Sequence, residues 1–517
     1  MSQAVIEPGS GGPAGGVLDA SSERDPKRWI ALLVIGISQL MVILDATIVN
    51  VAIPRAAADI GINPADTQWM VTAYALPFGA LLLLGGRVAD FLGRKRILMV
   101  SLAGFALASA IGGAAQAPWM IYSGRALQGV FAAMLAPAAL SLLTVTFRDP
   151  KERAKAFAVF GAIAGGGAAV GLVLGGLLTE YADWRWCFFV NIPVAIVAIA
   201  LAAPILTESR ISDRTHYDIP GAVVGTLGLA ALVWGFTRPT ALVPGTDQML
   251  GWGSWDTIAW LGAAVLLLAL FVVIERRSSS PLLPMRVLAN RNRAGAYVVG
   301  ALVGAGMFAV FLFLTLYMQL FLQYQPMHAG VAFLPFSVGV IVGAGIGSQL
   351  VIRFGPRVVV PAGLLLGTIG LLWLSRLDPS STYGNTLLPA MLVMSVGMGF
   401  VFMAVTNVAL IGISKDDAGV ASAMVNTTQQ IGGSLGTAVL TTFSTGAAAT
   451  FLAANLPVDA GADAVRATGA AAAVHGWSVA FFWAAMFFAA AMVASLALIR
   501  TGKIEATPVG DTVVHVG

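Results

Sequence analysis

Apolar runs of about 20 residues recur along nearly the whole chain, and they constrain the fold more than any other feature. A helix needs about 20 apolar residues to cross the roughly 30 Å hydrocarbon core of a bilayer. The 517 residues are 58% hydrophobic and only 10% charged, whereas a soluble domain carries roughly 25% charged residues. The sequence therefore predicts an all-α integral membrane protein.

The sequence contains fourteen of these runs. They lie at about residues 29–52, 69–88, 97–116, 119–144, 157–178, 187–206, 219–238, 256–275, 295–321, 329–352, 358–375, 388–412, 420–444 and 477–499. The first 28 residues are rich in Gly, Pro, Ser and acidic residues and lack the apolar run of a signal peptide. We expect 1–28 to be a disordered cytoplasmic tail and 501–517 a second cytoplasmic tail.

The basic residues favour one orientation of these spans. With the N-terminus in the cytoplasm, 23 Lys and Arg fall on the cytoplasmic side, 5 on the outer side and 1 within a span. The basic runs Gly93–Arg96, Arg148–Lys155 and Glu275–Arg293 then share one side. This is a strong positive-inside bias, so both termini are predicted to be cytoplasmic.

Several functional classes are disfavoured by the composition. The net charge of +4 is explained by membrane orientation, and the short basic loops lack the interleaved aromatics of a nucleic-acid site. The single cysteine, Cys187, excludes an internal disulfide, and four histidines without ligand spacing give no metal site. With no catalytic motif, the chain is predicted to be neither an enzyme nor a cofactor-binding protein.

The chain also carries an internal repeat. The segment GVFAAMLAPAALSLL from Gly129 aligns without gaps on GFVFMAVTNVALIGI from Gly399. These segments belong to spans four and twelve, so the sequence predicts two six-helix halves, 29–206 and 295–500. The linker 207–294 between them holds two extra spans. Transporters use repeated halves of this kind to alternate access to a central site.

Four motifs resemble a known family. They are GRVADFLGRKR (Gly86–Arg96), LDATIVNVAIP in span one, RALQG (Arg125–Gly129) and WRWCFFVNIP (Trp184–Pro193). Together they resemble the fourteen-span drug:proton antiporters of the major facilitator superfamily, from about Trp29 to Arg500. The resemblance implies the major facilitator fold and drug export from the bacterial cytoplasm, driven by the proton gradient without a cofactor.

The first of these motifs is predicted to form a gate. Its glycines allow close approach and a sharp reversal of the backbone, and its acid can pair with a cation or a helix end. The resemblance implies that the loop latches the cytoplasmic gate, with the acid facing the start of span thirteen. The gating residues are Gly86, Asp90, Gly93 and Arg94. The alternative is that this loop only sets the membrane orientation.

Asp45 and Arg125 are the clearest ionisable residues inside the spans. At about 1.5 Å per residue, Asp45 lies about 24 Å from the cytoplasmic start of its span, and Arg125 about 9 Å from the outer face. Their similar depth suggests that they meet, because charges inside a membrane usually face a cavity or each other. Burial raises the pKa of a carboxylate and a nearby cation lowers it, so Asp45 is predicted to take and release a proton as water access changes. A static ion pair is the alternative.

Span five carries glycines at helical spacing. Gly167, Gly171, Gly175 and Gly176 allow close helix packing in lipid. The antiporter signature that this span resembles has a proline where this chain has Leu172. That difference weakens the inference of antiport over symport, whereas the organisation into fourteen spans favours export.

Neutral polar residues within other spans are predicted to line the substrate cavity, with hydrogen bonding between helices as the alternative for each. They are accompanied by Met41, which shares a helical stripe with Asp45. These residues are Gln39, Tyr74, Gln128, Asn191, Tyr317, Gln319, Asn407, Asn426 and Gln430. Because span ten contains no acid, the expected substrates are amphipathic compounds that are monovalent cations or neutral.

These features together predict a proton-coupled exporter of amphipathic drugs or antibiotics in the bacterial cytoplasmic membrane. The nearest alternative is a dedicated exporter of one endogenous metabolite, lipid or self-made antibiotic. A proton symporter fits the motifs less well. A channel or receptor explains neither the paired halves nor the single carboxylate, and saturable counterflow would exclude a channel.

The topology can be tested with fused reporters. A reporter placed after Arg293 is expected to report a cytoplasmic position, and one placed near Gly461 an outer position, because the basic residues orient the spans. Reporters whose activity differs between the two sides of the membrane measure this. The opposite result at either position would contradict the fourteen-span topology.

Overall fold

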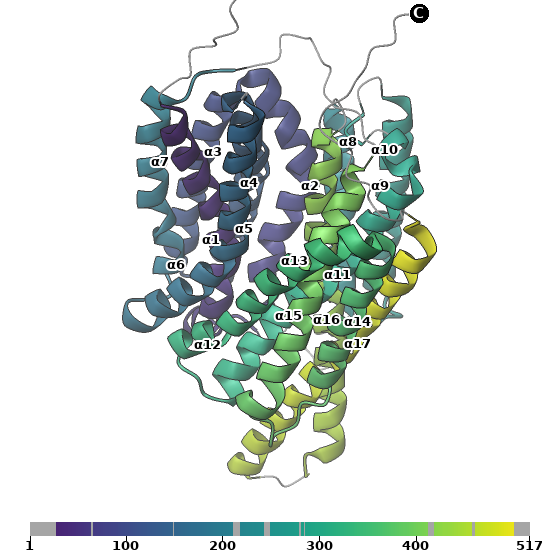
Figure 1. The fold of residues 1–517 in the computed structure, drawn as a ribbon. Coiled ribbons are helices and arrows are strands. Elements are labelled where there is room, and N and C mark those ends of the chain that lie inside the picture. Colours follow the sequence, from purple (N-terminus) through teal and green to yellow (C-terminus); the bar gives the residue numbers. More distant parts are fainter. Residues whose placement is uncertain are drawn as a thin grey trace, which may run out of the picture.

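The chain folds into long helices that run roughly parallel to one another (Figure 1). The computed structural model describes residues 27–63, 66–147, 149–209, 218–241, 249–278, 281–283, 285–411, 418–457 and 461–500. We call the end of the bundle where the first helix begins the proximal end, and the end where that helix finishes the distal end.

The first half contains six spans. Its helices are α1 (Arg28–Ile60), α2 (Trp69–Leu92), α3 (Arg94–Gly113), α4 (Pro118–Thr146), α5 (Pro150–Tyr181), α6 (Trp186–Phe189) and α7 (Asn191–Ile205). The linker adds α8 (Ile219–Thr237), η2 (Arg238–Thr240), α9 (Trp255–Arg277) and α10 (Met285–Ala289).

The second half repeats this organisation. Its helices are α11 (Arg291–Leu316), η3 (Tyr317–Phe321), α12 (Pro326–Ala332), α13 (Leu334–Phe354), α14 (Pro356–Leu374), η4 (Tyr383–Leu387), α15 (Leu388–Leu410), α16 (Ala418–Asn455) and α17 (Ala462–Leu498). Figure 1 shows the first half in purple to blue beside the second half in green to yellow.

The prediction of an all-α membrane fold is confirmed. Within the described residues, thirteen helices are long and apolar enough to cross a membrane. The one remaining predicted span, 157–178, corresponds to α5, a helix of 32 residues. Only its shorter segment Gly166–Tyr181 is found as an apolar helix within the described residues. Every predicted span therefore overlaps a helix or a pair of consecutive helices.

One segment differs from the expectation. Because the last two predicted spans are 420–444 and 477–499, residues 445–476 were expected to form an outer loop between them. Instead, α16 continues to Asn455 and α17 already begins at Ala462. This stretch is rich in alanine, which has the highest helix propensity of all residues, so the helices extend past the apolar runs. Figure 1 shows both helices projecting from the distal end.

The same helix pairs pack together in each half. In the first half α2 and α3 pack on α4, and α1 packs on α5. In the second half α13 and α14 pack on α15, and α11 packs on α16. Since α4 and α15 contain the two aligned segments, the sequence repeat corresponds to a repeat of tertiary packing.

The glycines of α5 lie where helices approach closely. An added Cβ at Gly167 would lie 2.9 Å from Cγ2 of Ile43, and one at Gly175 would lie 2.5 Å from the carbonyl oxygen of Ile48. At Gly176 it would lie 2.6 Å from Cα of Met327. Gly171 likewise faces Thr47. The first half thus uses these glycines to bring α5 against α1 and, through Gly176, against α12 of the other half.

This packing predicts a difference between two glycines of one helix. Gly175→Leu is expected to destabilise the protein by about 1–3 kcal/mol, because the new side chain overlaps the α1 backbone. Gly166→Leu is the matched control, since no atom of the described residues lies within 4 Å of a Cβ at that position. The thermal unfolding temperature of the detergent-purified protein measures the effect, and equal losses in both variants would contradict it.

Candidate functional site

The structure brings Asp45 of α1 and Arg125 of α4 into direct contact. Nη1 of Arg125 donates to Oδ2 of Asp45 at 2.5 Å. The side chains are only 0% and 2% exposed, respectively. Their opposite charges therefore neutralise each other inside the membrane-spanning bundle, which is the arrangement that an ion pair at this depth requires.

The second carboxylate oxygen is also fully engaged. Oδ1 of Asp45 accepts from Nε2 of Gln128 at 2.7 Å and from Nδ2 of Asn191 at 3.0 Å. Nε2 of Gln128 in turn lies 2.7 Å from Oγ of Ser109 on α3. Three further hydrogen-bonding side chains thus connect this carboxylate to α3, α4 and α7. Ser109 was missed by the sequence analysis, because a serine in a span carries no distinctive signal.

The guanidinium is held from several directions. Nε of Arg125 donates to the carbonyl oxygen of Met70 at 2.9 Å, and Nη1 donates to Oε1 of Gln128 at 3.0 Å. The guanidinium carbon lies 4.3 Å from the centre of the Tyr74 ring, a cation–π geometry. The Tyr74 hydroxyl donates to the carbonyl oxygen of Val42 at 3.4 Å. We call this cluster (Asp45, Tyr74, Ser109, Arg125, Gln128 and Asn191) the charged network.

The remaining cavity candidates are spread over the molecule. Tyr317 lies at the distal end, where its hydroxyl donates to the carbonyl oxygens of Asp378 and Ser381 at 3.3 and 2.9 Å. Gln319 donates from Nε2 to the carbonyl oxygen of Val51 at 2.8 Å. The structure therefore places both residues apart from the charged network, in hydrogen bonds between elements.

Polar side chains of α1, α15 and α16 agree better with the prediction that they line a substrate cavity. The Oε1 atoms of Gln39 and Gln430 are buried and have no hydrogen-bond partner among the described residues. Asn407 donates to Sδ of Met403 at 3.3 Å, and Met41 is buried. Asn426 precedes Gln430 by one helical turn and is exposed.

The predicted gating loop reverses sharply between α2 and α3. Gly93 has a φ of 108°, a conformation that favours glycine. Arg94 donates from Nε to Oδ1 of Asp90 at 2.8 Å, and Gly86 lies near Pro137 of α4. The acid was expected to face the start of span thirteen, but residues 412–417 and the side chains at 418–420 lie outside the described residues.

Glu208 anchors this loop and was missed by the sequence analysis. Its Oε1 and Oε2 accept from the backbone N–H groups of Lys95 and Arg96, each at 3.1 Å. A carboxylate here stabilises the positive end of the α3 dipole. A Cβ at Gly93 would lie 2.6 Å from the Glu208 carboxyl. The sequence signal that could have identified Glu208 is the position of an acidic residue directly after span six.

Contacts between the two halves close the distal end. Besides Gln319 with Val51, Nη2 of Arg55 donates to Oε1 of Gln325 at 3.1 Å. The backbone N–H of Met327 donates to Oε2 of Glu180 at 3.0 Å. One apolar cluster also joins Ile48–Ala56 of α1 to the core of the second half. These contacts were not predicted, because partner choice between distant helices leaves no local pattern.

Comparisons with known proteins agree with this architecture. The family model described as Major Facilitator Superfamily matches residues 35–437. Puromycin resistance protein pur8 of Streptomyces alboniger is 46% identical over 83% of this chain and 84% of its own length. Cephamycin export protein CmcT of Amycolatopsis lactamdurans is 38% identical over 80% of this chain and 84% of its own.

A solved structure shows the same fold. It is the crystal structure of a bacterial homologue of the human lysosomal transporter Spinster, in an inward-facing and unoccupied conformation. The TM-score is 0.65 at 16% identity, and the alignment covers 92% of this chain and 97% of that chain.

The charged network predicts unequal effects of its two charges on stability. Arg125→Ala is expected to cost about 3–5 kcal/mol, because it leaves a buried carboxylate without its cation. Asp45→Asn leaves the Arg125 charge without its carboxylate but is expected to cost less, because the amide oxygen still accepts a hydrogen bond and the guanidinium keeps its hydrogen bonds to Met70 and Gln128. The double variant should recover part of the Arg125→Ala loss, since no buried charge remains. Thermal unfolding of the four proteins measures this, and strictly additive losses would contradict the coupling.

Proposed function

The chain belongs to the Major Facilitator Superfamily, and we propose that it exports amphipathic drugs or antibiotics from the bacterial cytoplasm in exchange for protons. The observation that carries the proposal is the charged network, which holds one carboxylate in a span with a cation directly opposite. A group with this environment changes its charge when water access changes. It is therefore suited to link proton movement to helix rearrangement.

The orientation follows from the basic residues. Because the predicted cytoplasmic loops carry the excess of Lys and Arg, the proximal end faces the cytoplasm in this proposal. The distal contacts of Arg55, Glu180 and Gln319 then close the outer side. Asn426 supports an opening at the proximal end. Gln430 of α16 packs against Gly79 of α2, whereas Asn426, which lies one turn closer to the proximal end on α16, is exposed.

Proton binding at Asp45 would act on several helices at once. A protonated carboxyl no longer attracts the Arg125 guanidinium as an ion, although the guanidinium keeps its bonds to Met70 and Gln128. The contacts among α1, α2, α4 and α7 would then change together. A shift of this kind can favour a state with an open distal end, because binding shifts an equilibrium only through different affinities for its states.

The substrate class is supported by the side chains and by the relatives. The Oε1 atoms of Gln39 and Gln430, which accept no hydrogen bond from the part of the chain that the structure describes, can accept one from a ligand. Apolar residues such as Met41 dominate the surroundings, which suits an amphipathic compound. The names of the relatives include puromycin and cephamycin, so antibiotics are the first compounds to test, as monovalent cations or neutral molecules.

A dedicated exporter of one self-made antibiotic is the second candidate function. It is favoured by relatives named tetracenomycin C resistance and export protein and probable actinorhodin transporter. The range of transported substrates distinguishes the two candidate functions. A multidrug exporter moves chemically unrelated dyes and antibiotics, whereas a dedicated exporter moves one compound and its close analogues.

The proton-coupling role is tested with Asp45→Asn in inverted membrane vesicles. Accumulation of puromycin or a dye under a pH gradient is expected to fall to the level seen without a gradient, because the amide cannot ionise. Binding of the same compound should remain measurable. Fluorescence quenching or radiolabel uptake, with and without the gradient, measures this.

Glu275→Gln provides the matched control. Glu275 of α9 is another buried carboxylate, but it bonds the linker backbone at Leu283 and takes no part in the charged network. This variant should retain accumulation driven by the gradient. A folded Asp45→Asn protein that still accumulates substrate against its gradient would contradict the proton-carrier role.

A further inference from the structure

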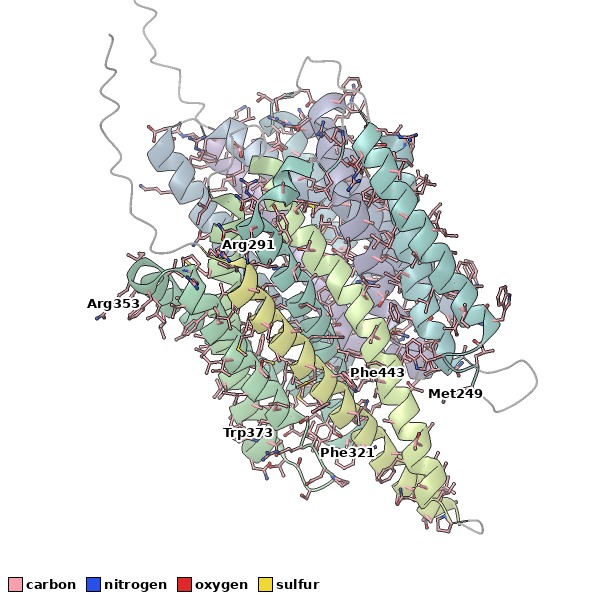
Figure 2. All side chains as sticks on the ribbon, turned by 90° about the vertical axis from the view of Figure 1, so that its right-hand side faces the viewer. Met249, Arg291, Phe321, Arg353, Trp373 and Phe443 are labelled. Atoms are coloured by element: carbon pink, nitrogen blue, oxygen red, sulfur yellow. The ribbon has the colours of Figure 1, made fainter. Side chains whose placement is uncertain are left out.

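A cavity of about 560 Å³ lies at the distal end of the second half, apart from the charged network. Its residues come from the last turns of α14, from the following turn, and from Asn385 and Thr386 of η4. Figure 2 shows Trp373 near the distal end, opposite to the end that carries Arg291. The volume falls within the range of small-molecule sites, roughly 300–1,000 Å³.

One wall of this cavity is apolar and faces outward. Ile369, Leu372 and Trp373 are 44%, 36% and 40% exposed. They continue an exposed apolar stripe with Val358 and Leu365 at helical spacing along α14. Because α14 packs on α15 and α17 of its own half, this stripe faces the lipid. Trp373 at its end has the position typical of aromatic residues at a membrane interface.

The other wall is a firmly held polar turn. The carboxylate of Asp378 accepts at Oδ1 from the backbone N–H of Ser380 and from its hydroxyl, both at 2.7 Å. Oγ of Ser381 adds a third bond to Oδ1 at 3.3 Å, and the Tyr317 hydroxyl ties the turn to η3. None of these three carboxylate bonds uses Oδ2.

This carboxylate keeps its negative charge. The hydrogen bonds from Ser380 hold the pKa of Asp378 below its usual value. Because a lowered pKa keeps the ionised form populated down to lower pH, Asp378 is charged at any pH between about 5 and 8. The cavity therefore presents a stable anionic group at the membrane surface.

The same cavity is lined by a guanidinium that has no partner among the described residues. Five arginines sit in distal segments of the described chain, and four of them are engaged. Arg55 bonds Thr179 and Gln325, Arg185 pairs with Asp59, Arg238 with Asp256, and Arg466 with Asp463. Arg376 lines the cavity, and its guanidinium makes no hydrogen bond or ion pair with the described residues.

We propose that this cavity binds the head group of a membrane phospholipid that carries both a phosphate and a primary ammonium, such as phosphatidylethanolamine. The phosphate lies on Arg376 and the ammonium on Asp378, while the acyl chains follow Leu372, Ile369 and Leu365 along α14. Arg suits phosphate because its donors match the phosphate oxygens, and a primary ammonium donates to a carboxylate, which a choline group cannot.

The site is tested on the purified full-length protein by native mass spectrometry. Dioleoyl phosphatidylethanolamine, phosphatidylcholine and phosphatidylglycerol are titrated separately, and phosphatidylethanolamine should bind most tightly. Arg376→Gln is expected to weaken its binding about tenfold, because a charge-assisted bond to phosphate is lost. Asp378→Asn keeps an Oδ1 acceptor for the turn and should lower phosphatidylethanolamine binding to the level of phosphatidylcholine.

Arg466→Gln is the matched control, because Arg466 is another distal arginine but pairs with Asp463 on the exposed start of α17. Its lipid binding should equal that of the unmodified protein. Equal binding by Arg376→Gln and Arg466→Gln, or no preference for phosphatidylethanolamine over phosphatidylcholine, would overturn the proposal. Soluble glycerophosphoethanolamine binding as tightly as the lipid would also overturn it, because the acyl chains would then contribute nothing.

Discussion

The attraction between the Asp45 carboxylate and the Arg125 guanidinium acts where no water screens it, and the arrangement of the first half depends on it. Each charge alone would cost several kcal/mol in this position. The Asp45 carboxylate therefore accepts hydrogen bonds from side chains of α4 and α7, and the Arg125 guanidinium donates to the α2 backbone as well as to this carboxylate. Any event that changes one of the charges changes the balance of forces on several helices.

Close backbone contact provides the complementary constraint. Lipid offers little hydrophobic drive for helices to associate, so small residues allow the contacts that hold them together. Gly175 brings α5 onto α1, and Gly176 brings the same helix onto α12 of the second half. Because α5 belongs to both contacts, a shift of α1 that followed a change at Asp45 would reach the closed distal end directly.

The two ends of the bundle are built differently. At the distal end, Arg55, Glu180 and Gln319 join the halves to each other. At the proximal end, Glu208 holds the loop between α2 and α3 within the first half. The first kind of contact must break for the halves to separate at the distal end, whereas the second holds a sharp turn within one half.

The sequence by itself determined the spans, the repeat and the two charges inside the membrane, because hydropathy and helical spacing are local properties. Tertiary structure alone decided the partners. It placed Tyr317 and Gln319 in distal hydrogen bonds and attached Glu208 to the loop at Gly93. It also left Arg376, in the cavity that Asp378 lines, without a partner among the described residues. It also extended α16 and α17 through a segment expected to be a loop. The physical reason is that a hydrogen bond between distant helices depends on how the whole bundle packs, and no short stretch of sequence encodes that.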